Sequence, residues 1–127
     1  MQGIPESVAH KVVSYGDGVF AKVTDERSDS NLPVEGELPR ELFGMFARNS
    51  PNPRFEPQGR YHWFDGDGMV HAVYFENGHA RYANRYVRTR GYELEEAAGK
   101  ALWTGILEPI VADHPHGPAK NTANTDL

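Results

Sequence analysis

The chain has 127 residues, a net charge of −5 and 39% hydrophobic residues, which fits one small globular domain with a modest core. The acidic balance argues against a nucleic-acid partner, because phosphate contacts need a basic surface. The absence of cysteine excludes disulfides, a thiol nucleophile and cysteine-based metal sites. With no apolar run of roughly 18 residues and no signal-peptide core, we expect a cytoplasmic location.

The first half of the chain predicts short, separated strands. Residues 1–33 are polar and mixed and are expected to form an extended arm, with a strand at residues 19–23. Further strands are predicted at residues 34–38 and 44–48, with a helical turn between them at residues 40–43.

A β-hairpin is the clearest predicted element. Residues 69–75 and 80–89 are rich in Val, Tyr and Phe, as strands are. They are joined through Asn77-Gly78, the strongest short-range signal for a type I′ turn. We therefore expect positive φ at both turn residues and pairing near Phe75 and Ala80.

The remaining segments are a stiff loop, one helix and an irregular end. Residues 49–57 carry three prolines, which remove amide donors and fix φ. Residues 93–103 form the one convincing helical stretch, and Glu93, Glu95 and Glu96 are expected to be solvated on its surface.

The string His62-Trp-Phe-Asp-Gly-Asp-Gly-Met69 is the most specific motif of the chain. Asp and Gly tolerate the backbone of tight turns, and the aromatic pair provides large apolar anchors. It predicts a tight turn that leads into a buried strand, with Asp65 and Asp67 accepting hydrogen bonds from nearby amides.

A calcium loop is an alternative interpretation of the same turn. Asp65, Asp67 and Glu76 have calcium-loop spacing, but Met69 and Val70 stand where an EF-hand needs an oxygen ligand and a glycine. A structural turn is therefore favoured, and a calcium-stabilised domain stays as a rival.

No complete active site is visible from residue chemistry alone. His114-Pro-His116 and the pair His62 and His71 invite a metal interpretation, but spacing does not supply the three or four converging ligands that a metal needs. The chain also lacks a Gly-x-Ser-x-Gly elbow and a phosphate-binding glycine pattern. We expect no catalytic residue and no metal ligand within it.

Five segments taken in order resemble the carotenoid cleavage oxygenase family, which includes carotenoid, apocarotenoid and lignostilbene dioxygenases. They are residues 34–39, residues 42–53, residues 62–71, Ala83-Asn-Arg-Tyr-Val-Arg-Thr89 and Lys120-Asn-Thr-Ala-Asn-Thr125. The resemblance covers about residues 34–127, with a minor departure at Ser50, where many relatives carry Gly.

The resemblance implies an all-β fold that is part of a seven-bladed β-propeller with one short helix. Residues 1–33 would be the N-terminal arm, and residues 34–127 most of one blade and the start of another. The propeller axis of the family holds a non-haem Fe(II) on four histidines, and the enzymes cleave a polyene or stilbene double bond with O2 to give two carbonyl products.

The resemblance also implies that this chain is the N-terminal portion of such an enzyme. Family members are several times longer, and their iron ligands lie downstream of the segment matching residues 120–125. No histidine here matches a ligand position, so we expect no bound iron and no activity of the chain alone. The six histidines are His10, His62, His71, His79, His114 and His116.

Substrate contact is implied for Trp63 and Phe64, because stilbene-cleaving relatives carry aromatics near the substrate there. Packing between blades is an equally good role for both residues. Ile106 stands near the place of a tyrosine in phenol-selective stilbene cleavers, which favours a carotenoid or apocarotenoid substrate. The alternatives are a stilbene-cleaving enzyme and a small non-catalytic β module that binds a ligand.

The partners expected from the resemblance are an apolar polyene or stilbene and O2. The full-length enzyme is expected to contact a membrane surface. A blade buries its faces only against its neighbours, so the isolated chain should expose apolar surface and self-associate.

Overall fold

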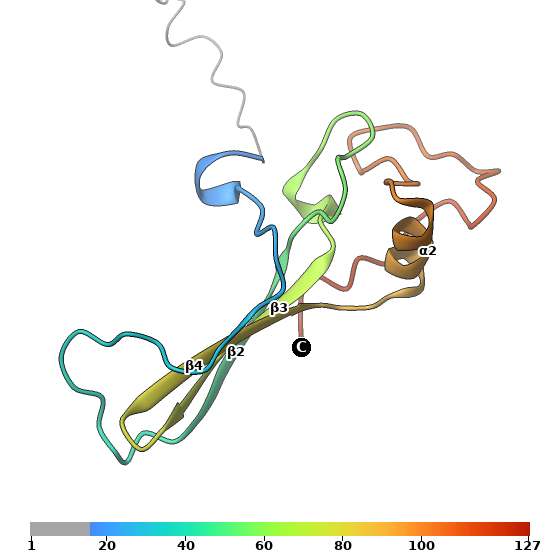
Figure 1. Ribbon diagram of the computed structural model, residues 1–127. Coiled ribbons are helices and arrows are strands. Elements are labelled where there is room, and N and C mark those ends of the chain that lie inside the picture. The colour runs from blue at the N-terminus through green and yellow to red at the C-terminus, as the bar shows by residue number, and fades with distance from the viewer. Residues whose placement is uncertain (1–15) are drawn as a thin grey trace, which may run out of the picture.

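The computed structural model describes residues 16–127 and is built around one antiparallel sheet with strand order β1-β4-β3-β2 (Figure 1). Helix α2 and the loops on either side of it gather at one end of this long, twisted sheet, and the hairpin turn lies at the other end. The elements are η1 (Gly18–Phe20), β1 (Ser28–Asp29), β2 (Gly44–Pro51), η2 (Trp63–Asp65), β3 (Gly68–Glu76), β4 (His79–Tyr86) and α2 (Arg90–Ala98).

The predicted hairpin is confirmed in both its turn and its register. Asn77 and Gly78 have φ values of 56° and 78°, and Phe75 pairs with Ala80. The strand predicted at residues 44–48 is also confirmed. It extends to Pro51, because every residue of β2 finds a partner on β3.

Two predicted strands are wrong. Residues 19–23 contain the end of the 3-10 turn η1 and an extended segment outside any strand, and residues 34–38 form a bend with Gly36 at a φ of 86°. The outer edge of β4 pairs only with Ser28 and Asp29, and neither segment pairs as a strand there or at the free edge of β2. Strand-like composition is not sufficient without such a partner.

The predicted helical elements differ at their ends. The turn at residues 40–43 is a single hydrogen-bonded turn in which Leu42 N donates to Pro39 O. Helix α2 begins at Arg90, since the Thr89 side chain accepts from Tyr92 N as an N-cap, and it ends before Gly99, whose φ of 70° is left-handed. The helix is therefore earlier and shorter than residues 93–103.

Two asparagine side chains attach the extended segment before β1 to the sheet. Asn52 accepts from Val23 N at 2.8 Å and donates to Val23 O at 3.0 Å. Asn84 of β4 accepts from Arg27 N at 2.6 Å and donates to Asp25 O at 2.8 Å. Both side chains are buried, so they satisfy this backbone in place of a neighbouring strand.

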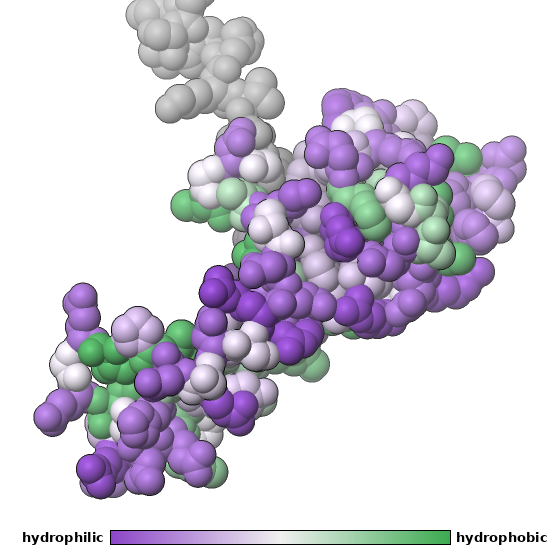
Figure 2. Space-filling view, in the orientation of Figure 1, coloured by the Kyte–Doolittle hydropathy of each residue, from purple (hydrophilic) through white to green (hydrophobic). Residues whose placement is uncertain are grey.

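The core is small and is divided between the end of the sheet near α2, where Met69, Tyr92 and Ala101 are buried, and the β3–β4 pairing farther along, where Ala72 and Ala80 are buried. Large apolar side chains are exposed along β2 and just before it, with Phe43 78% exposed. Figure 2 shows apolar surface at the end of the sheet distant from α2. The buried apolar residues are Met69, Ala72, Ala80, Tyr92 and Ala101. Within residues 16–127, no helix is long and apolar enough to cross a membrane.

Candidate functional site

The turn before β3 is fixed by hydrogen bonds within its own motif. His62 begins η2, and its Nδ1 accepts from Phe64 N at 3.0 Å. The Asp65 carboxylate returns the interaction by accepting from His62 N at 3.0 Å. This reciprocal cap holds Trp63 and Phe64 in a defined backbone conformation.

Asp65 also joins this turn to the loop that follows α2. Its Oδ1 accepts from Ile106 N at 2.9 Å. The loop approaches so closely that a Cβ on Gly105 would lie 1.9 Å from Asp65 Oδ2. Glycine is therefore required at position 105 for the loop to reach the carboxylate.

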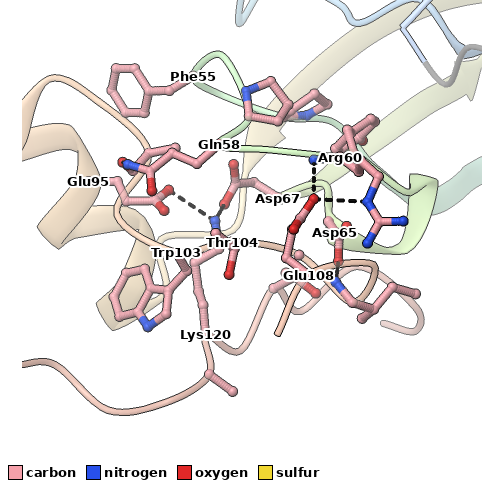
Figure 3. A pocket seen from close by; sticks show the side chains of 18 of the residues that line it. Phe55, Gln58, Arg60, Asp65, Asp67, Glu95, Trp103, Thr104, Glu108 and Lys120 are labelled. Carbon is pink, nitrogen blue, oxygen red and sulfur yellow. Dashed lines mark hydrogen bonds and ion pairs between the residues drawn. The ribbon is translucent and has the colours of Figure 1, made fainter. Parts of the chain in front are cut away.

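A buried ion cluster lies beside the turn (Figure 3). Lys120 Nζ contacts Asp67 Oδ1 at 3.0 Å and Glu95 Oε2 at 2.9 Å, and the Lys120 side chain is only 11% exposed. The remaining carboxylate oxygens accept from Arg54 N and Leu102 N. Burial by itself would lower the pKa of the Lys120 ammonium, but the two carboxylates outweigh burial and hold the pKa above its usual value.

The segment 120–125 packs directly against the start of β3. Gly68 N donates to Thr122 O at 2.8 Å, and a Cβ on Gly68 would lie 2.1 Å from Ala123 O. From β2, Asn49 Nδ2 donates to Ala123 O at 2.6 Å. Two of the five segments used in the sequence comparison, residues 62–71 and 120–125, are thus in backbone contact.

Asn124 completes this contact from the C-terminal side. Its Nδ2 donates to Phe64 O at 2.8 Å and to Gly66 O at 2.8 Å. The two carbonyls flank Asp65, so the side chains of Asp65 and Asn124 together fix the turn.

A cavity of about 340 Å³ lies between the turn, the proline-rich loop and the residues that follow α2 (Figure 3). The Asp67–Lys120–Glu95 cluster forms part of its wall. Burial, and then the nearby Asp65 and Asp67, raise the pKa of the lining Tyr61 hydroxyl to about 12, which keeps that hydroxyl protonated. The apolar walls of the cavity include Phe55, Trp103, Ile106 and Ile110.

The two predicted substrate-contact residues lie outside this cavity. The Trp63 ring packs edge-on against Phe20 at 5.3 Å and lines a hollow of about 300 Å³ that it shares with His71. Phe64 is 63% exposed, with its ring edge-on to His62 at 4.6 Å. Ile106, which does line the cavity, is 62% exposed.

Three of the described histidines use their ring nitrogens in contacts within the chain. His62 caps η2, and His71 Nδ1 lies 2.6 Å from the Tyr82 hydroxyl. His114 uses Nε2 on Leu102 O and Nδ1 on His116 N.

Among residues 16–127, no group of three or more His, Cys, Asp or Glu could hold a metal ion, so these residues do not by themselves supply the four-histidine iron site that the resemblance implies. His10 lies outside the described residues.

The structural interpretation of the Asp-Gly turn is confirmed, because both carboxylates accept amide hydrogen bonds as expected. The calcium interpretation has no support here, since the oxygens of Asp65 and Asp67 are occupied by amides and by Lys120.

Sequence reasoning missed Glu95, Lys120 and Asn124. The expectation that Glu95 is solvated is wrong, because its side chain is 2% exposed. The one available signal was its position three residues after Tyr92, on the same face of α2 as that buried ring. Lys120 and Asn124 lie in a segment that the sequence analysis used only for the family resemblance, and nothing in that segment predicts their contacts with the turn.

An antiparallel four-stranded sheet with one short helix, which leaves large apolar side chains exposed, is what part of a β-propeller blade provides. The chain belongs to the family described as retinal pigment epithelial membrane protein, whose model matches residues 20–127. The predicted family and mainly β fold are confirmed, and the chain is part of a propeller of this family.

Curated relatives are up to 49% identical to this chain over the aligned residues. A carotenoid cleavage oxygenase of Mycobacterium tuberculosis is 48% identical over 89% of the chain and 21% of its own length. A carotenoid 9,10(9',10')-cleavage dioxygenase of Crocus sativus is 49% identical over 68% of the chain and 16% of its own length. The chain therefore spans about a fifth of such relatives.

Solved structures agree with this assignment. The lignostilbene dioxygenase of Pseudomonas brassicacearum superposes with a TM-score of 0.73 at 27% identity, covering 87% of this chain and 23% of the enzyme. A variant of the Synechocystis apocarotenoid oxygenase superposes with a TM-score of 0.67 at 32% identity, covering 81% and 23%.

Proposed function

We propose that the chain is the N-terminal part of a dioxygenase that cleaves a carbon–carbon double bond of a carotenoid or apocarotenoid with O2, giving two carbonyl products. The observation that carries this proposal is the 48% identity to a carotenoid cleavage oxygenase over 89% of the chain. That match includes most of the residues that build the Asp-Gly turn and its contacts.

The contribution of these residues, in this proposal, is to shape an apolar surface for the substrate. Phe64 and Ile106 are both exposed apolar residues; Phe64 directly precedes Asp65 in the chain, and the Ile106 N–H donates to the Asp65 carboxylate. An elongated apolar substrate would cover them and gain hydrophobic free energy. The chain alone would bind no iron and would be inactive, since its described residues offer no ligand set.

A stilbene-cleaving activity is the second candidate. It is supported by the superposition on a lignostilbene dioxygenase and by 37% identity to an isoeugenol monooxygenase of Pseudomonas nitroreducens. Ile106 weighs against it, because an aliphatic side chain offers no hydrogen bond to a phenolic hydroxyl.

The deciding experiment uses the whole protein supplied with Fe(II) in air and given an apocarotenal or a hydroxystilbene in separate reactions. Chromatography of the aldehyde products should show cleavage of the apocarotenal and little of the hydroxystilbene. The reverse preference would favour the second candidate. Cleavage of neither substrate, or tight iron binding and cleavage by the 127-residue chain alone, would contradict the proposal.

A further inference from the structure

Asn124 contacts the backbone of Phe64 although sixty positions separate them in sequence. Its side-chain amide donates two hydrogen bonds, one to Phe64 O and one to Gly66 O, both at 2.8 Å. Thr125 Oγ1 donates to Asn124 Oδ1 at 3.0 Å, so the orientation of the amide is itself fixed. Both donors are thereby committed to the two carbonyls on either side of Asp65.

The anchoring of Asn124 makes it a rigid support. Four residues earlier, Lys120 is held in the buried cluster by Asp67 and Glu95. Between them, Thr122 O accepts from Gly68 N at 2.8 Å. The segment that carries Asn124 is therefore attached to the sheet and to α2 before it reaches Phe64.

The Phe64 side chain, whose backbone carbonyl Asn124 binds, is exposed. Phe64 is 63% exposed, and its one aromatic neighbour among the described residues is His62, two residues away. The one ring contact, with His62, lies within the turn itself, and the backbone beneath the Phe64 ring is fixed by Asn124 and by the Asp65 cap.

We infer that Asn124 is a positioning residue for substrate binding: through the Phe64 carbonyl it sets where the Phe64 ring meets an apolar polyene. This inference rests on the proposed function. It assigns Asn124 an effect on substrate affinity without contact between Asn124 and the substrate, and without an effect on the chemical step.

The test measures KM and kcat of the whole protein for one long-chain apocarotenal, and substrate affinity by quenching of tryptophan fluorescence. The variants are Asn124→Ala, Phe64→Ala and the double variant. Asn121→Ala is the matched control, because its side chain accepts only from Ala123 N within its own segment. Asn124→Ala should raise KM and the dissociation constant about tenfold with kcat changed less than about twofold, and the control should change neither.

The double variant separates positioning from a general effect. If Asn124 acts through Phe64, then Asn124→Ala should change KM less than about twofold once Phe64 is already Ala. Asn124→Asp keeps the side-chain shape but places an acceptor against two carbonyls, and it should raise KM at least as much as Ala.

Each other outcome overturns the inference in a recognisable way. Additive effects in the double variant, or a loss confined to kcat, would show that Asn124 does not act through Phe64. An Asn124→Ala protein without a cooperative thermal transition would assign the residue to folding. A wild-type protein that neither binds nor cleaves the apocarotenal would remove the proposed function, and the inference with it.

Discussion

Asn84 accepts the backbone N–H of Arg27 at 2.6 Å, one residue before strand β1 begins. The same amide donates to Asp25 O, so a single side chain continues the sheet beyond its last true strand pair. Removing it leaves the Arg27 N–H and the Asp25 carbonyl without their side-chain partner, and the following prediction tests that consequence.

Asn84→Ala should lower the free energy of unfolding of the whole protein by about 2 kcal/mol or more and loosen the segment before β1. Limited trypsin digestion should then cut faster after Lys22 and Arg27, as followed by mass spectrometry. Asn121→Ala, on an exposed residue, should stay within about 0.5 kcal/mol and keep the wild-type digestion rate. Equal digestion rates of the two variants would show that the Asn84 side chain does not hold the segment before β1.

Lys120→Met should be the more damaging change, with a cost of about 3–5 kcal/mol, because it leaves the buried Asp67 and Glu95 carboxylates without their cation. Urea unfolding measures the difference. Arg27→Met is the control, since its ion pair with Asp29 is exposed and should contribute no more than about 1 kcal/mol. A Lys120→Met protein as stable as this control would show that the cluster is dispensable.

His71 should make stability depend on pH in a defined direction. Burial, and then the Arg48 charge, lower the pKa of its imidazole from 6.5, so the folded protein binds the proton less readily than the unfolded chain. Stability from this group is present above about pH 6.5 and falls as the pH drops toward the folded-state pKa. Urea midpoints at pH 7.5 and 5.5 should differ less in His71→Phe than in the wild type. An unchanged difference would assign the pH dependence to other groups.

Gly78→Val should destabilise the hairpin by about 2 kcal/mol, because a β-branched residue resists the positive φ found there. Asn77→Gly provides the control, as glycine adopts the same backbone freely and should be nearly neutral. Thermal unfolding followed by circular dichroism compares the two. A Gly78→Val protein with an unchanged transition would mean that the turn can adopt another geometry at no cost.

The isolated 127-residue chain should bind the dye ANS at neutral pH and associate at micromolar concentrations. Phe43, Met45 and Phe46 expose apolar surface on and beside edge strand β2, which would be covered in a complete propeller. The whole protein should do neither. Dye fluorescence and light scattering decide the matter, and a monomeric chain with a sharp thermal transition and no dye binding would favour a self-contained module.

Local sequence was sufficient where the structure depends on neighbours in the chain. The hairpin follows from Asn77-Gly78 between two β-prone segments, and the roles of Asp65 and Asp67 follow from the chemistry of Asp in turns. The predicted helix, residues 93–103, begins and ends too late. In the structure the Thr89 cap and the left-handed Gly99 set the two ends, and hydrophobic periodicity does not.

Long-range contacts explain what sequence reasoning missed. The buried Glu95 carboxylate pairs with Lys120, 25 residues away, and Asn124 donates to a carbonyl sixty residues upstream. Neither relationship has a local signature. Residues 34–38 have strand-like composition but form a bend and pair with no strand of the sheet, so composition alone does not predict pairing.

The clamps made by Asn52 and Asn84 have a consequence for how this sequence can vary. Both recognise main-chain atoms of the segment 23–27, and main-chain atoms are the same whatever side chains the segment carries. Substitutions within that segment, proline excepted, should leave these four hydrogen bonds in place. The clamp positions themselves have no such freedom, because a buried side chain with both a donor and an acceptor is needed at each. Residues 23–27 can therefore accept many substitutions while their backbone keeps the same path along the sheet.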